Sequence, residues 1–206
     1  MGAIFMSASV PTLDPNRKDY WSTADVVSIR SAVLALVRVA LGRRLIVWGG
    51  HPSITPMVWA VAEDLGVDYA QCVHLYQSRY FEADFPKENR RFRNVTLVDA
   101  VPGDLKQSLE SMRSKMFKSH DFESGVFIGG MEGIWDEFRL LRKLAPNTLL
   151  FPIASCGGAA LEIFEKERVF HDLPGLQSDR DFIGLFHRIL RIAPNDNRDW
   201  RNFGAR

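Results

Sequence analysis

The 206-residue sequence has little cysteine and no long hydrophobic run, and each of these absences excludes some classes of protein. Two cysteines, Cys72 and Cys156, are too few for a disulfide scaffold and suit a reducing compartment. The longest apolar stretch, residues 32–41, is interrupted by Arg38 and is too short to span a bilayer. The first ten residues lack the basic region of a signal peptide. We therefore expect a soluble, cytoplasmic protein.

An excess of charge of either sign is also missing. The sequence has 26 Lys and Arg against 25 Asp and Glu, which argues against a protein that mainly coats nucleic acid. The hydrophobic content of 46% excludes a disordered chain, and the length suits one domain over residues 1–206, with a polar, Arg-rich tail from about residue 194. The Cys and His residues show no metal-ligand spacing, so we expect no metal site, and the residues imply no particular cofactor.

Apolar runs alternate with amphipathic segments along the chain. The runs predict strands at residues 3–7, 44–48, 72–76, 95–98, 125–128 and 149–153. Helical spacing and stop signals predict helices at residues 26–40, 55–65, 105–116, 132–144, 159–167 and 182–189. Strands that are apolar throughout and alternate with helices are typical of a parallel sheet covered on both faces. The predicted fold is α/β, a three-layer Rossmann-like sandwich with a mainly parallel sheet of about six strands.

Some details of the local structure are also predicted. We expect capping boxes at residues 22–25 and 178–181, each with an acidic residue three positions after a serine, and an N-cap at Thr55. Residues 78–94 are polar and rich in aromatics and arginine, and we interpret them as a loop or lid. The run 90–93 within this segment is either a solvated surface or a lid that faces phosphate or nucleic acid, and a solvated loop is the simpler interpretation.

Four turns of small residues follow predicted strands. They are Ser7-Ala8-Ser9, Gly49-Gly50-His51, Gly129-Gly130-Met131-Glu132-Gly133 and Ser155-Cys156-Gly157-Gly158. In a parallel sheet all four lie at the carboxyl edge, where open α/β folds bind ligands. Glycine allows positive φ and close approach of a ligand, and a following helix offers unpaired N–H groups to an anion. The sequence therefore predicts a phosphate- or nucleotide-binding crevice formed by these residues.

The two common nucleotide fingerprints are missing from the sequence. Without G-x-x-x-x-G-K-[ST], a P-loop NTPase is disfavoured. Without G-x-G-x-x-G after the first strand, an ordinary NAD dehydrogenase is disfavoured as well.

Residues 129–137, Gly-Gly-Met-Glu-Gly-Ile-Trp-Asp-Glu, resemble the P-G-G-x-G-T-x-x-E signature of the LOG phosphoribohydrolases. Residues 112–116 lie where that family has its R-K-x-x-M helix. Residues 5–11, 49–52 and 155–160 are similar to divergent branches of the wider SLOG superfamily, which occur as nucleotide-sensing modules in bacterial conflict systems. The resemblance covers most of the chain in order and spacing. It implies a nucleotide-type small-molecule ligand and a homo-oligomer, and it leaves room for an effector protein as a partner.

The resemblance also implies roles for three residues. In a LOG-like enzyme, Arg113 and an acid at Asp136 or Glu137 would act on the ribose and its glycosidic bond. Ile128 stands where the family has proline, however, and Ile134 rather than threonine follows the last glycine. These departures favour a sensor or regulatory module that binds a nucleotide or an NAD- or ADP-ribose-derived molecule. The alternative is a phosphoribohydrolase that cleaves the N-glycosidic bond of a nucleoside 5′-monophosphate.

Other interpretations of the site residues stay open in the sequence. Arg113 lies three positions after Glu110, which also suits a surface ion pair. Acids at positions 136 and 137 are favoured by the helix dipole even without a ligand. His51 either contacts a ligand or caps neighbouring backbone. Cys156 is either a nucleophile at a helix amino end or a small buried turn residue, and the sequence favours the turn residue because it shows no base nearby.

Overall fold

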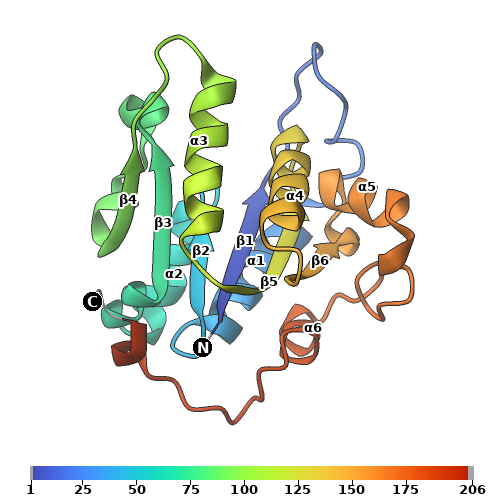
Figure 1. Ribbon diagram of the computed structural model, residues 1–206. Coiled ribbons are helices and arrows are strands. Elements are labelled where there is room, and N and C mark those ends of the chain that lie inside the picture. Colours follow the sequence, from blue (N-terminus) through green and yellow to red (C-terminus); the bar gives the residue numbers. More distant parts are fainter. Residues whose placement is uncertain (1, 204–206) are drawn as a thin grey trace.

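The first strand of the chain lies at the centre of the sheet. In the computed structural model, which describes residues 2–203, all six strands pair in parallel in the order β4-β3-β2-β1-β5-β6 (Figure 1). The strands are β1 (Ala3–Ser9), β2 (Leu45–Trp48), β3 (Val73–Ser78), β4 (Asn94–Val98), β5 (Phe122–Gly129) and β6 (Leu149–Ile153). All but the last residue of β1 are buried, as expected for a strand that is apolar on both faces.

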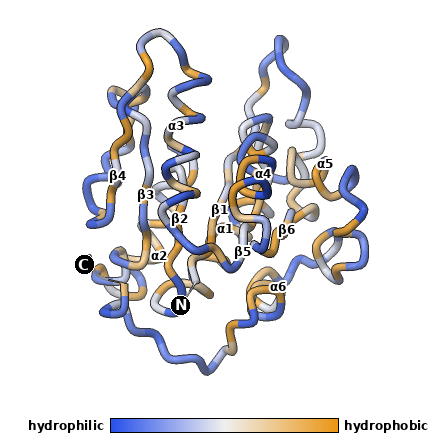
Figure 2. The backbone as a smooth tube through the Cα atoms, in the orientation of Figure 1, coloured by the Kyte–Doolittle hydropathy of each residue, from blue (hydrophilic) through white to orange (hydrophobic). Residues whose placement is uncertain are grey.

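Helices cover both faces of this sheet. They are α1 (Val26–Ala40), α2 (Thr55–Leu65), α3 (Leu105–Lys118), α4 (Glu132–Leu144), α5 (Gly158–Lys166) and α6 (Phe182–Ile189). Figure 1 shows α3 and α4 in front of the sheet and α1 and α2 behind it. Figure 2 shows mainly hydrophobic residues along the central strands and hydrophilic residues interspersed along α3 and α4 in front of them. The predicted fold class, a Rossmann-like α/β sandwich, is confirmed.

The predicted N-caps of three helices are wrong, although the predicted ranges 26–40, 55–65 and 182–189 match α1, α2 and α6. The N-cap of α1 is Asp25, whose carboxylate accepts a hydrogen bond from Ser28 N at 3.0 Å. The N-cap of α6 is likewise the aspartate of its predicted box, Asp181, and not the serine three positions earlier. Each aspartate directly precedes the first helical residue, so its carboxylate reaches the free N–H groups of the first turn. Thr55 lies inside α2, where its hydroxyl donates to His51 O at 3.0 Å.

The segment 78–94 is more ordered than the predicted loop. Ser78 ends β3, and two short 3₁₀ helices follow, η2 (Arg79–Asp84) and η3 (Lys87–Arg91). Within these helices and the strand, a buried amide pair ties the segment to the sheet: Asn89 Nδ2 donates to Gln77 Oε1 at 3.3 Å, and Gln77 Nε2 donates to Gly49 O at 2.8 Å. Buried hydrogen bonds of this kind fix the position of a loop relative to its neighbours, although Asn89 Oδ1 itself is buried without a partner.

The polar tail packs along the amino-terminal edge of the sheet. Figure 1 shows it running from α6 beneath the strands toward the β4 end of the molecule. The guanidinium of buried Arg43 donates to the carbonyl oxygens of Val39, Pro194 and Asp196 at 3.1, 2.8 and 2.8 Å. The tail also donates a hydrogen bond, from Asp199 N to Gly42 O at 2.8 Å. The tail is therefore held to the end of α1 by charge-assisted hydrogen bonds.

We expect the substitution Arg43→Ala to lower the free energy of unfolding by about 2–4 kcal/mol, because it removes three hydrogen bonds from a charged donor and leaves carbonyl groups unsatisfied. Urea denaturation followed by circular dichroism measures this change. The control is Arg38→Ala in the last turn of α1, five residues before Arg43, which removes an exposed ion pair with Asp64 and should cost less than about 1 kcal/mol. Equal losses in the two variants would contradict a structural role for the buried guanidinium.

Candidate functional site

A cavity of about 780 Å³ opens at the carboxyl edge of the sheet. It is lined by the ends of β1, β2 and β3, by residues 81–86, and by parts of α3 and α4. The order in which strands are added to the sheet reverses at β1: β2, β3 and β4 lie on one side of it, and β5 and β6 lie on the other. Open parallel sheets bind ligands at such a switch point, and this volume is within the range of about 300–1,000 Å³ that is typical of small-molecule sites.

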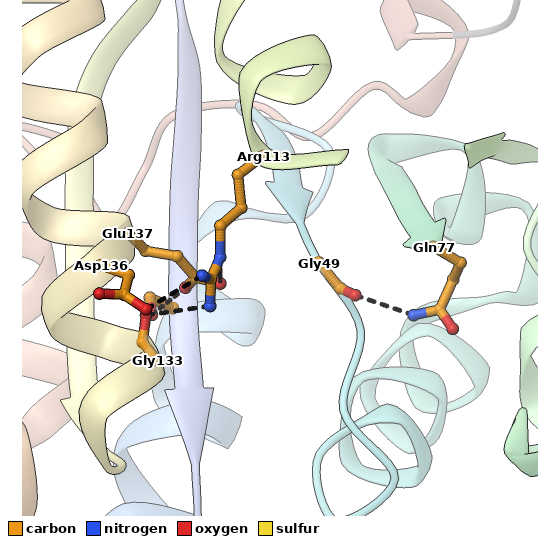
Figure 3. Close-up of polar contacts among 7 residues, drawn as sticks. Gly49, Gln77, Arg113, Gly133, Asp136 and Glu137 are labelled. Atoms are coloured by element: carbon orange, nitrogen blue, oxygen red, sulfur yellow. Dashed lines mark hydrogen bonds and ion pairs between the residues drawn. The ribbon is translucent and has the colours of Figure 1, made fainter. Parts of the chain in front are cut away.

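The centre of the cavity wall is a cluster of four charged or polar side chains. Ser7 Oγ, near the end of β1, donates to Glu137 Oε2 at 2.5 Å. From α3, Arg113 Nε donates to Glu137 Oε1 at 3.2 Å, and its terminal nitrogens lie 3.3 Å from Asp136 Oδ2 and 3.2 Å from Gly133 O (Figure 3). The cluster therefore connects one central strand with the two helices in front of the sheet.

The cluster settles two alternatives left by the sequence. The Arg113 side chain is only 9% exposed and faces α4, so its interpretation as a surface partner of Glu110 is wrong. Of the two adjacent acids, the Glu137 side chain is 15% exposed and points toward Ser7, whereas that of Asp136 is 60% exposed. Successive residues of a helix point in different directions, so only one of two neighbours faces inward. The inward acid is Glu137.

His51 caps neighbouring backbone, which is one of its two predicted roles, and its contact with a ligand stays a prediction. It lines the cavity, and its Nδ1 lies 2.8 Å from Ser53 Oγ and accepts a hydrogen bond from Ser53 N at 3.3 Å. Burial lowers the pKa of His51, and the nearby charge of Glu137 only partly opposes this effect. The imidazole is therefore mainly neutral at pH 7 and offers a ligand a hydrogen-bonding group rather than a positive charge.

The structure brings most of the predicted site residues to this cavity. Its lining includes Ser7, Ala8, Ser9, Gly49, Gly50, His51, Arg113, Met131, Glu132, Gly133, Asp136 and Glu137. Six other predicted residues lie outside the lining: Gly129, Gly130, Ser155, Cys156, Gly157 and Gly158. Ligand contact stays a prediction for every one of these residues, and the second set lies in packed turns beside the cavity rather than in its wall.

The residues outside the lining hold neighbouring turns together. Gly130 N donates to Ser9 O at 2.8 Å, and Ala159 N donates to Gly130 O at 2.9 Å, so three predicted turns are joined edge to edge. Gly157 has a φ of +71°, and a Cβ at this position would lie 1.8 Å from Thr23 O. These glycines are needed for close packing of backbone rather than for access of a ligand.

Cys156 is fully buried in the same packed turns. Burial is the main cause that raises the pKa of its thiol to about 12, so the thiol stays protonated at neutral pH. Its backbone carbonyl accepts a hydrogen bond from Asp25 N at 3.1 Å. These observations favour the interpretation of Cys156 as a small buried turn residue over that of a nucleophile.

Several residues of the lining were missed in the sequence. They are Arg17 from the loop before α1, Phe81, Asp84, Phe85 and Pro86 after β3, and Leu105, Leu109 and Met112 from α3. The apolar spacing of the α3 residues predicts a helix face but does not indicate that its first turns border a cavity. The aromatic content of the 78–94 segment was the one available signal for the far wall.

The charges that line the cavity are mostly acidic. Asp84, Glu132, Asp136 and Glu137 face two guanidinium groups, those of Arg17 and Arg113, and lysine is missing from the lining over residues 2–203. Arg113 is already bound to the acids of α4. Over the same described residues, His, Cys, Asp and Glu form no group of three or more that suits a metal ion, and no helix is long and apolar enough to cross a membrane.

Together these features define a Rossmann-like α/β protein with a ligand-sized cleft at the switch point of its sheet. The model of the SLOG cluster3 family matches residues 19–190, which is most of the chain, and the protein belongs to this family of the SLOG superfamily. The match confirms the SLOG resemblance and indicates a nucleotide-related module. A comparison with curated proteins gives no match.

We expect Gly157→Ala to destabilise the protein by at least about 2 kcal/mol more than Gly103→Ala. Both glycines have a φ of +71°, but Gly157 also has a ψ of −157°, a combination that side-chain-bearing residues essentially do not adopt. A Cβ at Gly157 would in addition clash with Thr23 O, whereas a Cβ at Gly103 meets nothing within 4 Å. Thermal and urea unfolding of the two variants measures the combined cost of the clash and the strain at Gly157. If the two variants were equally stable, the close packing of the turn against Thr23 would not be needed for folding.

Proposed function

We propose that the cleft binds a nucleotide or an NAD- or ADP-ribose-derived small molecule, and that the protein acts as a sensor or regulatory module. The observation that carries the proposal is the carboxylate of Glu137, which is held in the cleft by Ser7 and Arg113. Each carboxylate oxygen has a second lone pair after these contacts, so the group is a fixed acceptor for the hydroxyls of a ribose.

The amino end of α4 supports the anionic part of this proposal. Its first turn borders the cavity through Glu132 and Gly133, and within the described chain no side chain caps it. The N–H groups of a first helical turn have no partner inside the helix and, with the helix dipole, favour an anion. Because lysine is missing from the cavity wall among residues 2–203, backbone amides and Arg17 are the groups that would meet a phosphate.

The arrangement of Glu137 favours binding over bond cleavage. Both of its oxygens already have protein partners, and Asp136, the more accessible acid, forms part of the same ion-pair cluster. A phosphoribohydrolase remains the second candidate because Arg113 and both acids, which the LOG resemblance implies as catalytic groups, meet in one cleft. A homo-oligomer and an effector partner in a bacterial conflict system are predictions that come from the resemblance.

The sensor and the phosphoribohydrolase predict different results in one assay. Purified protein is incubated with AMP, NAD and cyclic ADP-ribose, and binding is followed by the shift in melting temperature while released base or nicotinamide is measured by chromatography. We expect at least one nucleotide to raise the melting temperature without turnover, since a ligand that binds only the folded state stabilises it. Quantitative release of a base would overturn the sensor proposal in favour of the hydrolase. If none of the three compounds changes the melting temperature at millimolar concentration, both candidate functions are overturned.

The role of Glu137 is tested by the substitution Glu137→Gln. The amide preserves the size of the side chain but removes the charge that strengthens hydrogen bonds to a ribose, so we expect about tenfold weaker binding of the nucleotide that binds the unmodified protein. Isothermal titration calorimetry measures the affinity. The control is Glu110→Gln, an exposed acid on α3 outside the cavity lining, which should leave the affinity within about twofold. Equal affinities of all three proteins would exclude contact between Glu137 and the ligand.

A further inference from the structure

An apolar wall forms the half of the cavity that is furthest from Glu137 along the sheet. We define this wall by Phe81, Phe85 and Pro86 after β3, together with Leu105 and Leu109 of α3. Phe81 and Leu105 are 37% and 39% exposed, so apolar surface is left open to solvent inside a ligand-sized cavity. Exposed apolar surface of this kind, bordered by polar groups, is characteristic of a binding site.

The wall is anchored to the sheet rather than being a loose loop. Gln77, the residue before the last of β3, donates through Nε2 to Gly49 O at 2.8 Å and accepts from Asn89 Nδ2 at 3.3 Å. Figure 3 shows the first of these bonds bridging the turn after β2 and the strand that leads into the wall. Ser78 Oγ also accepts a hydrogen bond from Tyr80 N at 3.3 Å. The aromatic rings are therefore presented on a fixed backbone, which lowers the entropy that binding would cost.

The order of the strands separates the apolar wall from the polar cluster. The wall follows β3, Ser7 belongs to β1, and α4 with Glu137 follows β5. The carboxylate of Glu137 reaches back from α4 to Ser7 of β1, and its Oε1 would lie 3.9 Å from a Cβ at Gly49, just after β2. Neighbouring strands lie about 4.8 Å apart, so the two steps from β3 to β1 separate the wall from this carboxylate by about 10 Å. One elongated cavity thus has an apolar, aromatic end and a polar end that holds Arg113, Glu137 and the amino end of α4.

We propose that the aromatic base of the nucleotide stacks against Phe81 and Phe85, while its ribose and phosphate extend toward Ser7 and α4. This inference rests on the proposed function and adds the orientation of the ligand and the residues that select for a planar ring. Aromatic side chains stack on the π-face that every base has, so the wall selects a nucleotide over a sugar phosphate rather than one base over another.

The experiment measures AMP, NAD and ribose 5-phosphate binding to the full chain by isothermal titration calorimetry. The variant is Phe81→Leu, which keeps an apolar side chain of similar bulk but removes the aromatic face. We expect it to weaken binding of AMP or NAD by about tenfold, as loss of base stacking typically does, and to leave binding of ribose 5-phosphate unchanged. The matched control is Trp21→Leu, since Trp21 is a half-exposed ring that lies outside the cavity lining; Tyr80 is unsuitable because its ring packs against that of Phe81. Its affinities should stay within about twofold.

The outcomes separate this inference from the function on which it rests. If AMP or NAD binds the unmodified protein and binds Phe81→Leu equally well, the stacking wall is overturned and the nucleotide site stands. If Phe81→Leu weakens ribose 5-phosphate as much as the nucleotides, the effect is a distortion of the whole site, and stacking is again overturned. If neither nucleotide binds the unmodified protein, this inference falls together with the proposed nucleotide site.

Discussion

The guanidinium of Arg113 is buried between α3 and α4, and a buried cation is stable only when its charge and its N–H groups are matched. Here the match comes from α4, through the carboxylates of Glu137 and Asp136 and the carbonyl of Gly133. Ser7 then binds the far oxygen of Glu137 and ties the helix pair to the central strand. Removal of one partner would leave a buried charge uncompensated, so the geometry of the cleft and the packing of the two helices depend on the same contacts.

A second constraint acts through backbone rather than charge. The turns after β1, β5 and β6 hydrogen bond to one another through Ser9, Gly130 and Ala159. Gly158 belongs to the same contact, because a Cβ there would lie 2.8 Å from the carbonyl carbon of Gly129. Tight backbone contact positions the start of α4, and through it Glu132 and Gly133, at the edge of the cavity. Some glycines of a binding-loop motif thus support the site without facing it.

The fold follows from the sequence to a large extent because its signals are local. The helix 132–144 and the strand 149–153 are correct at both ends, since proline, glycine and the change of hydrophobic period mark their limits. The cap errors at α1 and α6 fall where two residues compete for one role, because a serine and an aspartate three positions apart both suit an N-cap. Strand ends were also missed, and β5 begins at Phe122, three residues before the predicted start. The 3₁₀ helices at residues 79–91 lack a strong period, and tertiary hydrogen bonds from Gln77 and Asn89 stabilise the segment.

The candidate site, like the fold, could be predicted from the sequence only in part. By itself, the sequence determined the parallel sheet, the small-residue turns at its carboxyl edge and the SLOG resemblance, because these depend on residue type and on spacing along the chain. Only the tertiary structure decided which acid of the pair at 136 and 137 points inward to Ser7, which glycines pack against backbone, and which aromatic residues border the cavity. These properties depend on the direction of side chains and on contacts between residues far apart in the sequence, such as Ser7 and Glu137, which are 130 positions apart, and spacing along the chain does not specify them.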